Sequence, residues 1–282
     1  MKLSDKYYSG RDVQRLLGIS EPQLRTLVSN KKLKKVTPPG RKTSVYLKAE
    51  VNAYAEQWEA FLMAKEPPKT TFELPELEDM EEENELDRKT VGGAGMSADV
   101  RRAWLAANHA LDYHVRHNGK LVAFLRMLPL KKEVIESFMR GEVRGKDIPA
   151  SAIETFEPGK HIECLIIGIS SDPDVDENTR SHYVLRLIRE AARNFEELGR
   201  NGVIIDRIYA TSESPTGIAM ALHIGMHEQP PKLGKRIRFV MDIDNADSFL
   251  AARYKQGLNE WKKRQSKPTS DKKRKTALKE EV

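Results

Sequence analysis

Polar side chains gather on one face of a short helix predicted near the amino terminus. Ser20 with Gln23 three residues later is a helix-start pattern, and Leu24, Leu27 and Val28 then recur on a single side of the helix. The opposite face carries Pro22, Arg25, Thr26 and Ser29, and Gln23 flanks it. Side chains of these types hydrogen-bond to base edges and phosphates, and a helix of this width fits the major groove of B-DNA. The face is therefore a candidate surface for binding double-stranded DNA.

A basic hairpin is predicted directly after this helix. Residues 34–37 and 43–47 are short strand-like runs that flank the turn sequence PPGRK at 38–42. Lysines also line the approach to the first run, so the helix and the hairpin would present positive charge to phosphates together. The candidate phosphate-contacting residues are Lys31, Lys34, Arg41 and Lys42.

Two further helices are expected to position this surface. Ser9 and Asp12 form a capping-box pattern for a helix over residues 10–17, which ends at Gly18. An apolar stripe from Val51 to Leu62 predicts the helix that closes a small core after the hairpin. The elements expected are therefore two helices joined by a tight turn, a hairpin and a third helix.

The run SGRDVQRLLGISEPQLRTLV, followed by KKLKKVTPPGRKTSVYLKAEVNAY, resembles the winged helix-turn-helix domain of the MerR and excisionase families. The resemblance implies binding to double-stranded DNA, with the second helix in the major groove and the hairpin as a wing on adjacent phosphates. It also implies that a homodimer is a candidate assembly. Pro67 and Pro68, however, end the third helix too early for the long coiled coil of typical MerR regulators.

The charges are segmented along the chain, although the formal net charge of +6 is modest. Acidic residues concentrate between Glu73 and Asp87, without a sustained apolar period, and several glycines follow. This composition predicts a flexible acidic linker over residues 67–97, and the lysine-rich end predicts a basic disordered tail over residues 262–282. The two domains expected are therefore residues 1–66 and 98–261.

Residues 98–261 are predicted to form a mixed α/β domain. A helical stretch leads into two strand-like runs separated by Asn118-Gly119, a strong hairpin signal because both turn positions need positive φ. A helix near residues 131–140 follows. The later elements alternate as strand 162–170, helix 180–197, strand 203–211, helix 215–224 and strand 236–243.

This order of elements, with the run IDRIYATSESPTGIAMALHIGM, resembles the GNAT acyltransferase fold over roughly residues 98–250. The resemblance implies acetyl-CoA as a candidate cofactor. The pyrophosphate motif of the family, Arg/Gln-x-x-Gly-x-Gly/Ala, falls on Arg180 to Leu185, so Arg180 is the candidate cofactor-binding residue. Tyr183 and Leu185 occupy the glycine positions of that motif, and their bulk would obstruct the cofactor.

The same resemblance makes Glu163 the candidate catalytic residue, because many members of the family keep a general base at this place. The tyrosine that often serves as general acid in the family would fall near Ala221, which has no proton to donate. The sequence therefore leaves open whether this domain is an enzyme or a scaffold of the same fold.

Metal and thiol chemistry are not expected. Cys164 is the only cysteine, which excludes an intrachain disulfide, and its apolar neighbours indicate buried packing. The histidines show no paired spacing with a cysteine or a metal-binding glutamate. Asp172, Asp174 and Asp176 begin like a calcium loop, but Glu177 stands where that loop needs glycine.

No stretch approaches the roughly 18 consecutive apolar residues of a membrane span, and no signal-peptide pattern is present, so a cytoplasmic, nucleoid-associated protein is expected. The sequence as a whole predicts an α+β chain of two domains, a small winged helix-turn-helix and a mixed α/β GNAT-like domain. The leading interpretation is a sequence-specific DNA-binding regulator whose GNAT-like domain serves oligomerisation, partner contact or ligand sensing. Two alternatives stay open: an acyl-CoA-dependent N-acetyltransferase targeted by its DNA-binding domain, and an excisionase-like architectural factor.

Overall fold

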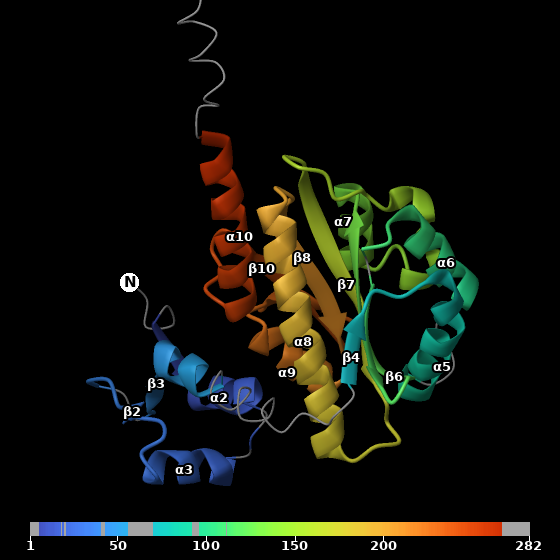
Figure 1. Ribbon diagram of the computed structural model, residues 1–282. Helices are drawn as coiled ribbons and strands as arrows, with labels where there is room; N and C mark the ends of the chain where they lie inside the picture. The colour runs from blue at the N-terminus through green and yellow to red at the C-terminus, as the bar shows by residue number, and fades with distance from the viewer. Residues whose placement is uncertain are drawn as a thin grey trace, which may run out of the picture.

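A computed structural model places a small amino-terminal domain beside a larger α/β domain (Figure 1). It describes residues 6–17, 19, 21–40, 43–55, 70–91, 96–110 and 112–266. Within these ranges, no helix has the length and apolar character that a membrane crossing requires. The predicted wing tip, Arg41 and Lys42, lies outside the described residues, and so does most of the predicted tail.

Three helical segments and a three-stranded sheet form the described part of the amino-terminal domain. The capping box is confirmed, since Asp12 accepts a hydrogen bond from the Ser9 amide at 2.9 Å and Ser9 accepts one from the Asp12 amide at 3.2 Å. The sheet has the order β1-β3-β2, and antiparallel pairing of Val36 with Val45 confirms the predicted hairpin. The elements are β1 (Tyr7–Ser9), α2 (Gly10–Leu17), α3 (Glu21–Ser29), β2 (Lys35–Val36), β3 (Val45–Leu47) and a helical segment over residues 48–55. Their shared core contains Val13, Leu16, Leu24, Leu33, Tyr46 and Val51.

A seven-stranded sheet forms the centre of the larger domain, in the order β4-β5-β6-β7-β8-β10-β9. Only β7 and β8 are parallel neighbours; every other neighbouring pair is antiparallel. Asn118 and Gly119 both have positive φ, of 53° and 83°, which confirms the predicted turn between β5 and β6. The strands are β4 (Thr70–Glu73), β5 (Asp112–His117), β6 (Lys120–Leu130), β7 (His161–Ser171), β8 (Ile204–Ser212), β9 (His227–Leu233) and β10 (Arg236–Asp242).

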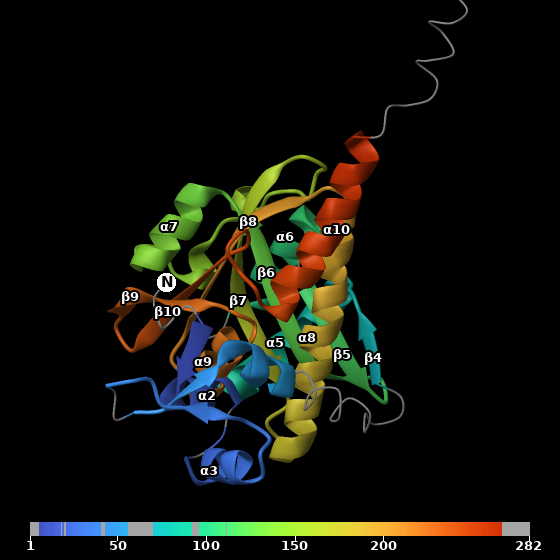
Figure 2. The same ribbon diagram turned by 90° about the vertical axis from the view of Figure 1, so that its left-hand side faces the viewer.

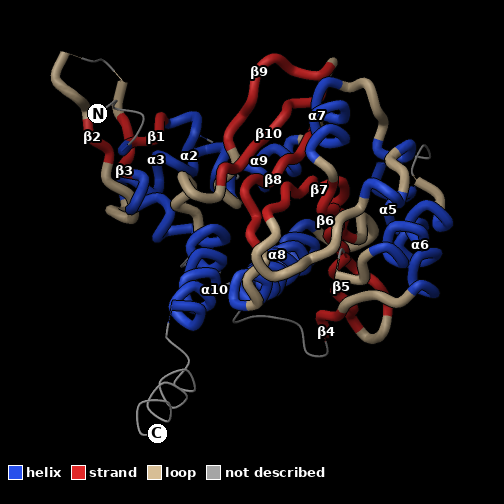
Figure 3. Tube along the Cα trace, turned by 90° about the horizontal axis from the view of Figure 1, so that it is seen from above, coloured by secondary structure: helices blue, strands red, loops and turns tan. Residues whose placement is uncertain are grey.

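Helices cover both faces of this sheet. On one face, α8 and α10 lie side by side, as Figure 3 shows, and their apolar side chains pack on β7, β8 and β10. On the other face, α6 and α7 pack on β6 and β7 around Trp104. The helices are α5 (Met80–Val91), α6 (Ala98–Ala107), α7 (Lys132–Arg140), α8 (Glu177–Arg200), α9 (Pro215–His223) and α10 (Phe249–Ser266), with short 3-10 turns η1 (Leu77–Asp79), η2 (Gly145–Asp147) and η3 (Ala150–Ala152).

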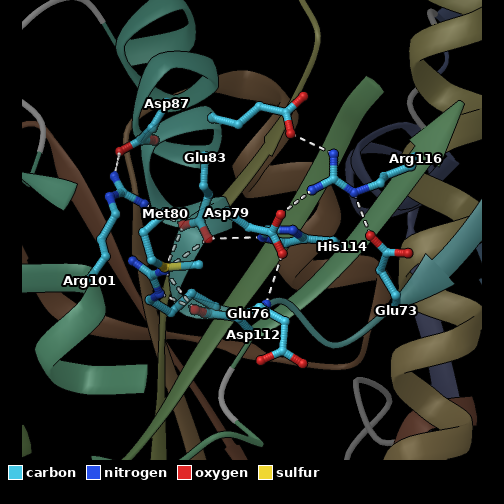
Figure 4. Close-up of polar contacts among 12 residues, drawn as sticks. Glu73, Glu76, Asp79, Met80, Glu83, Asp87, Arg101, Asp112, His114 and Arg116 are labelled. Carbon is cyan, nitrogen blue, oxygen red and sulfur yellow. Dashed lines mark hydrogen bonds and ion pairs between the residues drawn. The ribbon is translucent and has the colours of Figure 1, made fainter. Parts of the chain in front are cut away.

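The prediction of a flexible acidic linker is wrong for the part of it that the structure describes. Residues 70–91 form β4, η1 and α5, and β4 adds an edge strand to the sheet. The acidic side chains of α5 are held by arginines that lie far away in the sequence, as Figure 4 shows for Glu83, Asp87 and Arg101. A charge pattern read locally cannot reveal such partners. Met80 and Leu86, the apolar residues of α5 whose side chains are described, are both buried.

The basic carboxyl-terminal segment also begins later than predicted. Helix α10 continues to Ser266, so residues 262–266 extend the α/β domain, whose predicted end is residue 261. Residues 267–282 lie outside the described residues, and their predicted disorder stays a prediction.

Two glycines allow α8 and α10 to approach closely. A Cβ atom at Gly257 would meet the carbonyl oxygen of Glu196 and would lie 2.9 Å from the Arg200 amide nitrogen. A Cβ atom at Gly199 would lie 2.6 Å from the carbonyl oxygen of Tyr254. Because these neighbours are backbone atoms, they cannot move aside without displacing a helix.

Gly257→Ala should therefore destabilise the protein by about 1–3 kcal/mol, as overpacking does. Helix propensity alone predicts the opposite sign, because alanine is favoured over glycine by roughly 1 kcal/mol inside a helix. Urea unfolding of the variant and of the wild type measures the difference. A stabilised variant would contradict the close approach of the two helices.

Candidate functional site

The predicted DNA-facing side of α3 is exposed to solvent. Leu24 on the inner face is 3 % exposed, whereas the side chains named from the sequence all lie on the outer surface. Arg25 forms an i, i+4 ion pair with Glu21 at 2.5 Å, and 78 % of its side chain is exposed. An exposed pair of this kind contributes little to stability and leaves the guanidinium available for a stronger partner. The four residues brought together here are Gln23, Arg25, Thr26 and Ser29.

Two of these side chains also bond to the helix backbone. Thr26 Oγ1 donates to the Pro22 carbonyl and Ser29 Oγ donates to the Thr26 carbonyl, each at 3.0 Å. These bonds fix the rotamers of the hydroxyl groups, while their oxygen lone pairs remain able to accept hydrogen bonds. The face therefore offers a guanidinium donor, an amide and two oriented hydroxyls.

A lysine-rich turn continues this surface from the end of α3 to β2. Lys31 adopts a left-handed conformation with φ of 58°, which turns the chain back toward the sheet. Lys31, Lys32, Lys34 and Lys35 are all exposed. Residues 21–35 contain five basic side chains and one acidic side chain, so the local charge is strongly positive. Arg41 and Lys42 cannot be added to this surface, because they lie outside the described residues.

The amino-terminal domain docks on the larger domain through α2, not through α3. Helix α2 contacts α9, and in both views α2 lies next to α9 while α3 lies farther from the seven-stranded sheet (Figure 1, Figure 2). The partly buried ring of His223, at the end of α9, hydrogen-bonds to the backbone of Leu16 in α2. The docking therefore leaves the polar face of α3 uncovered.

The predicted catalytic residue, Glu163, lies near the start of β7 on the face covered by α7. It pairs in register with Arg207 of β8, whose Nη1 lies 3.7 Å from its carboxylate Oε1. Its other carboxylate oxygen is buried and accepts no hydrogen bond from any described residue. Burial raises the pKa of the neighbouring Tyr209 hydroxyl, and Glu163 raises it further. A carboxylate with an unused oxygen beside a protonated phenol could exchange a proton.

The parallel strands β7 and β8 separate beyond this point. Their pairing ends at Ile166 and Ala210, although β7 continues to Ser171 and β8 to Ser212. A gap between parallel strands at their carboxyl ends is a usual place for a ligand in α/β proteins.

The amino terminus of α8 does not fit an acyl-CoA pyrophosphate. Asp176 already caps this end, since its Oδ1 accepts hydrogen bonds from the Asn178 and Thr179 amides at 3.0 and 3.1 Å. The preceding turn carries two more carboxylates, Asp172 and Asp174, and a negative cap repels phosphate. Tyr183 is 2 % exposed. Arg180 is partly exposed in the first turn, but the amides that would hold a pyrophosphate beside it already have a partner.

Tyr183 has a structural role in the core. Its ring packs with Tyr113 and Leu187 between α8 and the sheet, and its hydroxyl hydrogen-bonds with His117 Nδ1 at 2.5 Å. A glycine at this position would leave a cavity. Ala221, at the place of the family's general acid, is buried in the core and is 6 % exposed. The residues present therefore do not support the cofactor chemistry that the resemblance implies.

Cys164 packs in the core at 0 % exposure, and burial raises the pKa of its thiol.

The aspartates of the loop before α8 bond to other residues of the chain. Lys120 Nζ lies 2.7 Å from Asp172, and Asp172 also accepts the Asp174 amide. Among the described residues, no group of three histidine, cysteine, aspartate or glutamate side chains is arranged to hold a metal ion.

A cavity of about 410 Å³ lies between the two domains, and the sequence predictions did not include it. Tyr8, Lys48 and Asn52 line it from the amino-terminal domain, and His223 and Asp247 line it from the larger domain. No motif marks these residues, which are up to about 240 positions apart in the sequence. Only the docking of α2 on α9 brings them together.

Comparisons with known proteins give structural likenesses alone. No protein-family model matches the chain, and a search of curated proteins finds no match. Solved structures with a similar backbone include the loading GNATL domain of CurA from Lyngbya majuscula, at 8 % identity and a TM-score of 0.46, covering 62 % of this chain and 98 % of that one. The GphF GNAT-like decarboxylase in complex with isobutyryl-CoA gives 10 % identity, a TM-score of 0.43 and coverages of 61 % and 98 %. The ribosomal-protein-S18-alanine N-acetyltransferase from Escherichia coli is 14 % identical with a TM-score of 0.38. This match covers 61 % of this chain and 93 % of that one.

At these identities, and with TM-scores below 0.5, the likenesses carry no inference about fold family, reaction, cofactor or partner. The GNAT-like assignment of the larger domain stays a prediction. The winged helix-turn-helix assignment and the binding of DNA stay predictions.

Proposed function

We propose that this chain is a regulatory protein that binds double-stranded DNA through α3 and the lysine-rich turn after it. The observation that carries the proposal is the way the domain docks. Helix α2 makes the contact with α9, whereas the polar face of α3 and four exposed lysines remain open to solvent. A helix followed by a basic hairpin has the order of elements that places a helix in the major groove and cations on phosphates.

Specific recognition would come from α3 and affinity from the lysines. Arg25 can exchange its exposed ion pair with Glu21 for a bidentate contact to guanine, and Gln23 is of the type that pairs with adenine. Each lysine that meets a phosphate releases a counterion, which strengthens binding to any sequence at low salt. The larger domain then serves as the body on which this small domain is held.

The direct test is selection from a pool of random duplexes with the full chain at near-physiological salt, followed by sequencing. We expect enrichment of a short motif, with Kd for the enriched duplex at least about 10³-fold below that for the starting pool. Bending of the enriched duplex would identify the architectural, excisionase-like form of the same function. Failure to retain any duplex even at low salt would contradict the proposal.

A second candidate, an N-acetyltransferase, is favoured by one observation, a buried carboxylate oxygen of Glu163 for which the described residues provide no hydrogen-bond donor. The capped end of α8 opposes it, because the amides that would hold a pyrophosphate are already bonded to Asp176. We therefore expect no saturable heat when acetyl-CoA is titrated into the protein to about 1 mM, which corresponds to a binding free energy weaker than roughly −4 kcal/mol.

Glu163→Gln separates the two candidates. Under the proposed function this variant binds duplex DNA as the wild type does. Under the second candidate it would lower the rate of acetyl transfer by about 10²-fold or more, the usual contribution of a general base. Micromolar binding of acetyl-CoA, together with that loss of rate, would establish the second candidate in place of the first.

A further inference from the structure

The hairpin of β9 and β10 in the larger domain ends in a cationic tip. Residues 227–238 contain four basic side chains and one acidic side chain. Lys232, Lys235 and Arg236 are all exposed. None of these three side chains has a hydrogen bond or an ion pair to another described residue. The hairpin tip, residues 232–236, therefore presents three positive charges to solvent.

Strand β9 adds almost nothing to the core of the larger domain. Six of its seven residues are exposed, whereas a strand with one buried face alternates between buried and exposed side chains. Leu233 is the exception, and it packs at the end of α7, where a Cβ atom at Gly141 would lie 2.5 Å from Leu233 Cδ1. Arg238 of β10 donates to the Met139 carbonyl at 2.9 Å. These contacts hold the hairpin on α7 and leave the cations of its tip exposed.

The outer edge of β9 is a poor site for another β-strand. Pro230 and Pro231 have no N–H to donate, so a strand added at this edge would lose ladder hydrogen bonds. Lysines also protect sheet edges from pairing, but here the prolines already do so. A polyanion is therefore a better partner for the hairpin tip than a strand of another protein.

The hairpin begins beside the amino-terminal domain and extends away from it. His227 and Glu228, at the start of β9, line the same interdomain cavity as Tyr7 and Tyr8 of β1. At about 3.3 Å per residue, β9 spans about 20 Å from there to Leu233, which is the length of about six base pairs of B-DNA. Strands β9 and β2 lie on the same side of the molecule, at the left in Figure 2 and at the top in Figure 3. A duplex held at α3 and β2 can therefore extend past the hairpin tip.

We propose that the hairpin tip is a second phosphate-binding surface, with which the larger domain contacts the duplex that α3 recognises. This inference rests on the proposed function. Lys232, Lys235 and Arg236 meet phosphates beyond the recognised motif and add affinity without base specificity. The docking of α2 on α9 fixes the separation of the two surfaces, so that one continuous duplex engages both.

Duplex length and hairpin charge are tested together on the full chain by fluorescence anisotropy. The probes are the enriched duplex trimmed to its motif, and the same duplex extended by about ten base pairs, one helical turn, at one end or at the other. Because the hairpin lies to one side of α3, we expect extension at one end alone to strengthen binding by about fivefold or more. Lys232→Ala with Lys235→Ala should abolish most of this gain and lower the slope of log K against log salt by about 2 on the extended duplex. The same variant should bind the trimmed duplex as the wild type does.

The matched control is Lys262→Ala with Lys263→Ala, which removes the same charge from exposed lysines of α10. Helix α10 lies on the opposite side of the molecule from β9 (Figure 3). We expect this control to keep the wild-type gain on the extended duplex. Lys235→Glu is a second variant, which changes one exposed side chain at the turn and should weaken binding to the extended duplex alone.

An equal gain at both ends, no gain at either end, or an equal loss in the control would overturn the hairpin contact. If Lys31→Ala with Lys34→Ala still weakens binding of the trimmed duplex, only the hairpin contact fails and the proposed function stands. A length-dependent loss in the hairpin variants, with no loss in the Lys31 and Lys34 variant, contradicts the role of α3 instead. A chain that retains no duplex contradicts both.

Discussion

Replacing Arg126 by methionine should lower the free energy of unfolding by about 3–5 kcal/mol, the usual cost of removing one partner from a buried ion pair. Arg126 is 0 % exposed, and its guanidinium donates to both oxygens of Asp112 at 2.6 Å and to Glu83 at 2.9 Å. Its guanidinium also lies 5.6 Å from the Trp104 ring. Methionine has a similar length, so the variant leaves two buried carboxylates without their main cation and creates little cavity.

The loss should depend on pH. In the wild type, burial raises the pKa of Glu83, but Arg126 and His114 outweigh burial and lower that pKa to about 2, from an ordinary value of 4.5. A depressed carboxyl pKa stabilises the fold above pH 4.5, and that stability is lost as the pH falls toward 2. In Arg126→Met the carboxyl groups can take up protons, so the destabilisation should be largest near neutral pH and smaller near pH 4.

Urea unfolding of both proteins at the two pH values measures this difference. Arg144→Met is the matched control, because Arg144 is exposed and its partner among the described residues is the surface residue Asp147; we expect a change below about 0.5 kcal/mol. A change below about 1 kcal/mol for Arg126→Met would show that α5 is not held to the sheet by this network. Residues 70–91 would then be closer to the flexible linker that their composition indicates.

Replacing Lys31 and Lys34 together by alanine should weaken duplex binding about tenfold or more at moderate salt. Each lysine that contacts a phosphate contributes about one unit to the slope of log K against log salt, so the slope should fall by about 2. The loss of affinity should be similar for all DNA sequences, because phosphates carry no base identity.

Arg25→Ala should instead act on specificity. We expect it to weaken binding to the selected duplex by about 1–3 kcal/mol and to relax selectivity at one base pair.

Fluorescence anisotropy over a series of salt concentrations measures both effects. The control for the double variant is Lys132→Ala with Lys146→Ala, two exposed lysines on the larger domain, which remove the same charge from another surface. Equal losses in the two double variants would mean that net charge, and not the α3 surface, determines binding.

Local signals in the sequence predicted the elements whose determinants are local. Ser9 and Asp12 cap α2 as their spacing indicates, and Asn118-Gly119 forms the turn that its residue types require. The predicted helix 180–197 begins three residues earlier in the structure, because Asp176 serves as its N-cap. Strand β9 was not predicted, since Pro230 and Pro231 interrupt its pattern and only an edge strand tolerates them.

Features that depend on distant partners could not be found in this way. The acidic segment forms β4 and α5, and its carboxylates pair with Arg101, Arg116 and Arg126, which lie outside it in the sequence. The cavity between the domains needs the docking of α2 on α9, for which no sequence motif exists. Glu163 was placed on the correct strand, but the N-cap that opposes acyl-CoA binding was visible only in the structure.

Hydrogen–deuterium exchange of the full chain, with and without an enriched duplex, shows whether α3 contacts DNA. We expect slower exchange of backbone amides over residues 21–36, at α3 and the lysine-rich turn, and unchanged exchange in α8 and α10. Duplex binding with protection confined to the larger domain, or with no protection of α3, would contradict this contact.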